Sequence, residues 1–182
     1  MSLRWDCGFW SRQDRAGESR ARDEELVHRL RDERHRGARA EYLENSAIGF
    51  AHAQHLQVNG KQLDGIEFDI QMTTDGQFVV VHDETLERLV GEQSWVMDKT
   101  LNQLTQYRQS DFSRYQPNFE QGFISQPILT LEQLYPYLTG YRHIELEIKI
   151  HIRTHPIVLV QNLLRLLSQY DWQILPITLT SF

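Results

Sequence analysis

The chain has 182 residues, of which 40% are hydrophobic and 24% are charged. That length fits one domain of ordinary size, and the composition is close to the average of soluble globular proteins, which excludes a fibrous or wholly disordered chain. The formal net charge of -6 argues against broad binding to nucleic acid or to an anionic membrane, because such binding needs a basic surface.

Cysteine content and hydropathy indicate the compartment. Cys7 is the single cysteine, so the sequence predicts neither an intrachain disulfide nor a thiolate zinc cluster. No stretch approaches the ~18 apolar residues of a membrane span, and charged residues interrupt the N-terminus where a signal peptide needs an apolar run. We therefore expect a cytoplasmic protein without a stable membrane anchor. The sequence leaves the oligomeric state open.

Residues 1–34 differ in kind from the rest of the chain. They are crowded with arginine and acidic residues and have almost no β-branched side chains. Leu26, Val27 and Leu30 have the spacing of one helical face, which predicts a short helix over about 23–33. We expect this charged segment to be a solvated helix or tail before the folded part.

From His35 onward, strand-like and helix-like segments alternate, which favours a mainly parallel α/β sheet. The expected strands are 65–71, 77–82, 143–151 and 173–180. The expected helices are 44–59, 101–107, 131–138 behind the N-cap Thr130, and 157–170. A short turn at 74–76 joins the first two strands, so they form either a hairpin or neighbouring barrel strands with a tight connection.

The segment 84–128 is long, polar and rich in aromatic residues. Loops of that length inside a compact domain are usually functional. We therefore expect an excursion that lies over an active site.

Two carboxylates share one face of the strand at 65–71. Alternation puts Glu67 and Asp69 on one side of the strand and the apolar residues on the other. If both faces are buried, adjacent anions need a cationic partner, whereas an exposed edge strand with a polar face would need none.

The strand at 143–151 repeats this pattern and adds Glu147 as a third carboxylate. Three carboxylates make a hard-oxygen site that suits Mg²⁺ or Ca²⁺ better than zinc. The simpler alternative is a ladder of Glu and Lys side chains on a solvated strand face.

Two of the eight histidines stand out by their position. His82 ends a very apolar strand and precedes a loop, where barrel enzymes keep catalytic groups. His35 is followed by an arginine and by a glycine, which lets the backbone approach a ligand.

Short motifs from His35 onward follow the order and approximate spacing of one known family. They are His35-Arg-Gly-Ala38, Glu44-Asn45, Gly65-Ile-Glu-Phe-Asp69, Thr74-Asp-Gly76, Val81-His-Asp83, Thr85-Leu86, Asp98 with Thr100-Leu101, Leu129-Thr-Leu-Glu132 and Glu147-Ile-Lys149. Each is weak alone, but together they are specific and cover about residues 35–182. The chain resembles the glycerophosphodiester phosphodiesterase family.

The resemblance implies a TIM-type (β/α)8 barrel, here incomplete with about its first five strands, over 35–182. The segment 84–128 would be the family's insertion after the third strand. The implied reaction is hydrolysis of small glycerophosphodiesters, the deacylated phospholipids, to sn-glycerol 3-phosphate and an alcohol.

The resemblance also implies roles for particular residues. The implied ligands of a divalent cation, Mg²⁺ or Ca²⁺, are Glu67, Asp69 and Glu147. The implied catalytic pair is His35 and His82. The residues implied to support the phosphate and the metal are Arg36, Glu44 and Lys149.

The chain departs from the family pattern in three places. Leu43 replaces the proline usual before Glu-Asn, which alters a loop but no ligand. The segment 29–34 is charged where a first barrel strand is apolar. The last segment resembles the end of the family's fifth strand, so we expect an open sheet whose robust hydrolysis needs further strands in cis or from another chain.

Two alternatives remain open beside an active phosphodiesterase. One is an inactive or truncated relative that acts as a binding or interaction fragment. The other is a sphingomyelinase D-like phospholipase, which shares the barrel and the paired histidines. That group is usually secreted and disulfide-bonded, which a single cysteine argues against.

Overall fold

The structure is a computed structural model that describes residues 35–39, 41–58, 60–110, 125–169 and 171–181. The N-terminal segment 1–34, including the helix expected over about 23–33, lies outside the described residues. No helix in the described ranges is both long enough and apolar enough to cross a membrane.

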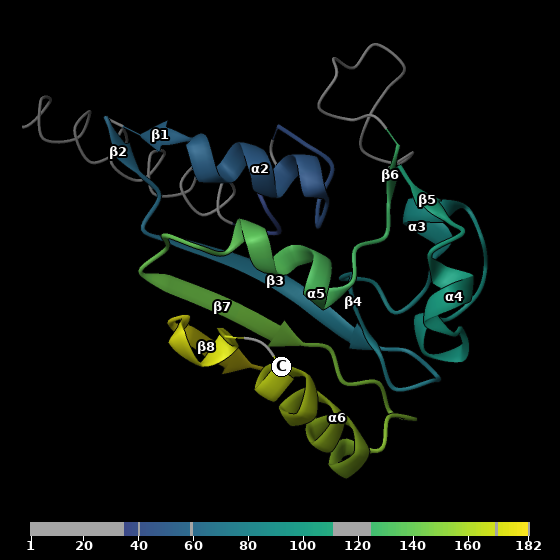
Figure 1. Cartoon of the computed structure of the whole chain (residues 1–182). Coiled ribbons are helices and arrows are strands. Elements are labelled where there is room, and N and C mark those ends of the chain that lie inside the picture. The colour runs from purple at the N-terminus through teal and green to yellow at the C-terminus, as the bar shows by residue number, and fades with distance from the viewer. Residues whose placement is uncertain (1–34, 40, 59, 111–124, 170, 182) are drawn as a thin grey trace, which may run out of the picture. The chain divides into compact units, whose positions relative to one another are not determined.

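A four-stranded sheet in the order β4-β3-β7-β8 forms the centre of the described fold. Its strands are β3 (Gly65–Met72), β4 (Phe78–Val80), β7 (His143–Ile148) and β8 (Ile177–Thr180). β3 runs parallel to β7, and β7 runs parallel to β8, as the arrows of β3 and β7 in Figure 1 show. This mixed α/β arrangement with a partial sheet agrees with the expected incomplete barrel.

β3 and β4 form an antiparallel hairpin, which decides between the two arrangements that the sequence left open. The turn closes because Thr73 donates its N–H to the carbonyl of Gln77 over 2.9 Å, and Gly76 supplies the positive φ of 74°. The last expected strand is partly wrong. The 3-10 helix η4 (Asp171–Ile174) includes its first two residues, and β8 begins only at Ile177.

The register of β3 and β7 separates an apolar face from a polar one. Ile66 pairs with Ile144 and Phe68 with Leu146, all four of them buried. The helix α2 (Ala47–His55) packs on this apolar face, where the Phe50 ring meets the Phe68 ring edge-on. The alternate side chains therefore carry their carboxylates on the other face.

The helix α6 (Pro156–Gln169) buries one stripe of leucines, namely Leu159, Leu163 and Leu166. Their spacing is that of one helical face, and the helix covers nearly all of the range 157–170 that the sequence predicted. Asn162 of the same helix places its Nδ2 3.6 Å from Sδ of Met72 at the end of β3. α6 thus lies against the sheet beside the hairpin turn.

The helix behind Thr130 is shorter than expected. α5 (Leu131–Leu134) begins with a capping box in which Thr130 and Gln133 exchange side-chain and backbone hydrogen bonds. Pro136 then lies within the 3-10 helix η3 (Tyr135–Tyr137), because proline has no N–H to continue the α-helical pattern.

The segment after β4 contains only short elements. They are α3 (Glu87–Val90), η1 (Val96–Asp98), α4 (Leu101–Leu104), β5 (Arg108–Gln109) and, after residues outside the described ranges, β6 (Gln126–Pro127). Two further short strands, β1 (Gln57–Val58) and β2 (Lys61–Gln62), follow α2. The helix expected over 101–107 thus ends at Leu104.

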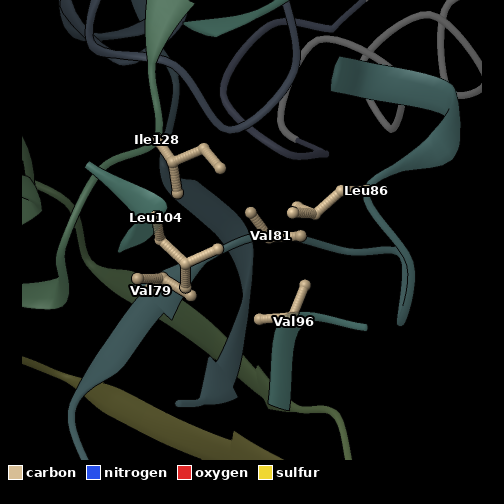
Figure 2. Close-up of a cluster of buried hydrophobic side chains, with 6 residues drawn as sticks. All are labelled: Val79, Val81, Leu86, Val96, Leu104 and Ile128. Carbon is tan, nitrogen blue, oxygen red and sulfur yellow. The ribbon is translucent and has the colours of Figure 1, made fainter. Parts of the chain in front are cut away.

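These short elements have a hydrophobic core of their own on β4. Figure 2 shows the cluster, which consists of Val79, Val81, Leu86, Val96, Leu104 and Ile128. Val79 pairs with Gln71, so Val79 and Val81 project from the same face as the carboxylates. The segment therefore packs on the polar side of the hairpin, beside the predicted site.

Candidate active site

Three carboxylates from the two central strands converge. Glu67 and Asp69 come from β3 and Glu147 from β7, and one oxygen of each lies within 4.8 Å of the others. They meet because the parallel register pairs Asp69 directly with Glu147. The structure thus brings the three predicted metal ligands to one place.

Burial makes this cluster unfavourable by itself. Asp69 is completely buried, and Oε1 of Glu67 is buried without a hydrogen-bond partner among the described residues. Burial, followed by repulsion from Asp69, raises the pKa of Glu67 to about 8. A divalent cation would neutralise the repulsion and occupy the free oxygen, so these residues fit such an ion.

The turn at 35–39 points a backbone donor at this cluster. Arg36, Gly37 and Ala38 have φ values of 54°, 68° and 57°, in the left-handed region that costs a non-glycine residue about 1 kcal/mol or more. In this conformation the N–H of Arg36 donates to Oε2 of Glu67 over 2.9 Å. The local strain is thus coupled to the position of a candidate ligand.

The side chain of Arg36 connects two buried acids. Its Nη1 donates to Oε1 of Glu44 over 3.1 Å, and its Nε lies 3.2 Å from Oδ2 of Asp69. Asn45 also donates from Nδ2 to Oδ2 of Asp69, over 3.1 Å. The hydrogen bond from Asn45 orients Asp69, and the charge of Arg36 offsets part of the cost of burying the carboxylate.

Lys149 supplies a positive charge at the other carboxylate oxygen of Asp69, Oδ1, whereas Arg36 lies at Oδ2. It continues β7, and its Nζ lies 3.1 Å from Oδ1 of Asp69 and also contacts Oε1 of Glu147. Burial acts to lower the pKa of Lys149, but the hydrogen bond to Glu147 and the charge of Asp69 outweigh it and raise the pKa above its usual value. The amine therefore stays charged.

His35 lies beside the carboxylates as a neutral imidazole. Its Nε2 is 3.6 Å from Oε2 of Glu67, and its Nδ1 is 3.3 Å from Nη1 of Arg39. Burial, followed by the charges of Arg36 and Arg39, lowers the pKa of His35 to about 4. At neutral pH this ring can accept a proton.

His82 is oriented by an acid that is itself held by an arginine. Nδ1 of His82 lies 2.8 Å from Oδ1 of Asp83, and Nε of Arg88 donates to Oδ2 of Asp83 over 2.6 Å. Burial acts to raise the pKa of Asp83, but the hydrogen bonds from His82 and Arg88 hold it well below its usual value. The ionised carboxylate favours a proton on Nδ1, which leaves Nε2 for a substrate.

Glu44 connects the two histidine segments. Its buried carboxylate accepts from Nη1 of Arg36 and from Nη2 of Arg88, the latter over 2.7 Å. Arg36 follows His35 in the chain, and Arg88 holds the acid beside His82. All eight predicted site residues therefore lie in one connected set of contacts.

Three further residues of the site were absent from the predicted set. Asn45 and Asp83 directly follow Glu44 and His82, so their adjacency was the signal that could have identified them. Arg88 lies on the four-residue helix α3. No local pattern marks it, because only the fold of the segment after β4 brings it to Glu44 and Asp83.

Comparison with known proteins gives a consistent family. The model of the "Glycerophosphoryl diester phosphodiesterase family" matches residues 35–175. A glycerophosphodiester phosphodiesterase of Caldanaerobacter subterraneus subsp. tengcongensis is 30% identical over 141 residues, which is 76% of this chain and 53% of that protein. The chain thus spans about half the length of this curated relative, and less of some others.

Solved structures of the same family also align with this chain. The crystal structure of a glycerophosphodiester phosphodiesterase from Thermotoga maritima aligns with a TM-score of 0.55 at 26% identity, over 81% of this chain and 52% of that one. A phosphodiesterase from Oleispira antarctica, solved with the product sn-glycerol-3-phosphate, aligns with a TM-score of 0.58 at 20% identity, over 81% and 56% of the two chains. The latter likeness concerns the fold alone.

Proposed function

Because this chain belongs to the glycerophosphoryl diester phosphodiesterase family, we propose that it hydrolyses glycerophosphodiesters to sn-glycerol 3-phosphate and an alcohol. The observation that carries the proposal is the convergence of Glu67, Asp69 and Glu147 within 4.8 Å, with His35 beside Glu67. His82 is connected to the same site through Asp83, Arg88 and Glu44. A phosphodiester is an anion that repels nucleophiles, so its cleavage needs concentrated positive charge and positioned proton carriers.

The carboxylates would hold Mg²⁺ or Ca²⁺, and the bound ion would neutralise a phosphoryl oxygen. Arg36 and Lys149 add fixed positive charge on two sides of Asp69. Glu44 keeps the guanidinium of Arg36 in place. In this assignment Arg36 and Lys149 stabilise the developing charge on phosphate, and Glu44 is a positioning residue.

The histidines divide the proton transfers between them. His35 is neutral at pH 7 because its pKa is lowered to about 4. As general base, it takes the proton of the hydroxyl group that attacks the phosphorus atom. His82 is held in place by its contact with Asp83, and in this proposal it gives a proton to the leaving oxygen as general acid. In this proposal the family domain spans 35–182 and includes an insertion at 84–128, and residues 1–34 are a charged segment outside the family match.

The test is the release of sn-glycerol 3-phosphate from glycerophosphocholine and glycerophosphoethanolamine by the purified chain with Mg²⁺ or Ca²⁺. We expect chelation with EDTA to abolish turnover. We expect Glu147→Gln to do the same, and Glu145→Gln, which removes a neighbouring carboxylate of β7 outside the cluster, to retain activity. A form of the chain extended by further family strands is assayed in parallel. If neither form releases product, the activity is absent and a binding fragment is the better description.

A further inference from the structure

Three residues from separate segments form a second cluster beyond the carboxylates. The rings of Trp95 and His151 meet edge-on, with centroids 4.6 Å apart and planes inclined by 60°. Nε2 of His151 lies 3.8 Å from Oε2 of Glu84. The backbone fixes this arrangement, because the N–H of Val96 donates to the carbonyl of Glu84 over 2.9 Å.

This cluster lies next to the groups that would bind phosphate. Glu84 follows His82 by two positions, and His151 follows Lys149 by two positions. Lys149 continues the ladder of β7, since its N–H donates to the carbonyl of Ile70 over 3.0 Å. Two residues of chain span at most about 7 Å, which is the scale of the distance from a phosphate to the far end of a small head group.

The exposed parts of the cluster are an aromatic ring and a carboxylate. Trp95 is 36% exposed and the side chain of Glu84 is 50% exposed, whereas that of His151 is 12% exposed. Arg153, two residues after His151, is engaged by Asp98, to which its Nη2 donates over 2.6 Å. An aromatic face beside an anionic group is the chemistry that attracts an organic cation.

We propose, on the basis of the proposed hydrolase function, that Trp95 and Glu84 recognise a cationic head group of the diester. A quaternary ammonium is the best fit, because it has no hydrogen to donate and is bound through the aromatic face and the carboxylate charge. His151 is a positioning residue that holds the Trp95 ring. The chain is therefore selective for choline-type diesters over diesters with a neutral head group.

The first arm of the test is a ratio of kcat/KM values for glycerophosphocholine and glycerophosphoglycerol, measured on the same enzyme preparation. We expect Trp95→Ala and Glu84→Gln each to lower this ratio about three- to tenfold, with little change for the neutral head group. The matched controls are Tyr137→Ala, which removes an aromatic ring from η3, and Glu87→Gln, which removes a nearby carboxylate. Both controls should keep the wild-type ratio.

The second arm needs no turnover. The full chain, isotopically labelled and kept in EDTA, is observed by NMR. The indole N–H resonance of Trp95 is the one that Trp95→Phe removes. Choline should shift this resonance, and glycerol should not. If hydrolysis fails but choline shifts this resonance, the proposed function falls and the head-group site stands. If hydrolysis proceeds and Trp95→Ala leaves the ratio unchanged, or if choline shifts nothing, the head-group site is refuted.

Discussion

The carboxylate of Asp83 is ionised because both His82 and Arg88 contact it. Its pKa is held below the usual 3.8, so it stabilises the folded chain above about pH 4, and this stabilisation is lost as the pH falls further. We expect Asp83→Asn to lower the melting temperature at pH 7 and the difference from wild type to shrink below pH 4. Thermal melts from pH 2 to 8 measure this.

The control is Asp64→Asn, which removes an exposed carboxylate in a loop pair with Arg142. It should leave the melting temperature nearly unchanged at every pH, because exposed ion pairs contribute little. A difference between Asp83→Asn and wild type that persists unchanged down to pH 2 would contradict the argument.

The contribution of Glu67 to folding stability depends on pH in the opposite sense to that of Asp83. Burial and the neighbouring carboxylates raise the pKa of Glu67 to about 8, so in the metal-free chain its stabilising protonated form is lost as the pH rises from about 4.5 to 8. We expect Glu67→Gln in EDTA to raise the melting temperature at pH 8. The free energy of unfolding should increase by an amount on the order of 1–3 kcal/mol. Added Ca²⁺ should stabilise the wild type and have much less effect on this variant.

Calorimetric melts with EDTA and with Ca²⁺ separate these effects, and Glu145→Gln is again the matched control. If Ca²⁺ stabilises wild type and Glu67→Gln equally, Glu67 is not a ligand.

Single residues could be predicted from the sequence where strand periodicity alone fixes their direction. Alternation along β3 was sufficient to place Glu67 and Asp69 on one face. Arg88 could not be predicted in this way, because its contact with Glu44 depends on how the segment after β4 folds. Tertiary contacts of that kind have no local period in the sequence.

The turn at 35–39 is an element in which backbone strain and packing act together. A Cβ at Gly37 would lie 2.8 Å from Cδ1 of Phe50, whereas one at Gly91 would meet nothing within 4 Å. Both glycines have positive φ, of 68° and 78°. Comparing Gly37→Ala with Gly91→Ala therefore isolates the cost of the clash from the cost of the left-handed conformation.

We expect Gly91→Ala to cost about 1 kcal/mol in unfolding free energy and Gly37→Ala to cost a further ~1–3 kcal/mol through overpacking. Because Arg36 donates to Glu67 from this turn, Gly37→Ala should also weaken cation binding. Urea denaturation and a Ca²⁺ titration measure the two effects. Equal stability losses in both variants would show that Phe50 moves aside freely.

The elements were predictable as far as patterns extend over several turns or residues. The helix-like segment at 157–170 and the alternation of β3 and β7 gave the correct element types. The start of β8 was wrong because an apolar run does not distinguish a strand from the 3-10 turn η4 that buries Trp172. The helix α5 ends early because Pro136 follows it within η3.

At the scale of the whole molecule, the important feature is that β8 forms one edge of the central sheet. In the described part of the chain it pairs only with β7, and Leu179 on it is 48% exposed. An apolar groove lined by Leu164, Leu167, Leu175 and Leu179 borders this strand. An unpaired strand edge beside apolar surface favours association with other chains.

We expect the isolated chain to self-associate in a concentration-dependent way, and Leu179→Lys to reduce this association. Ile152→Lys is the control, because Ile152 is 95% exposed but lies outside the sheet. Sedimentation velocity over a hundredfold range of concentration measures the effect. If both substitutions reduce association equally, general charge and not the strand edge is responsible.

Asp69 and Glu147 are neighbours only because β3 and β7, which lie far apart in the sequence, pair in one register. Closing so long a loop costs entropy before any contact is gained, which makes such pairings slow to form. A slip by one residue would turn Glu147 to the opposite face. A cation that needs all three carboxylates would therefore bind only correctly paired chains and, by mass action, would select them during folding.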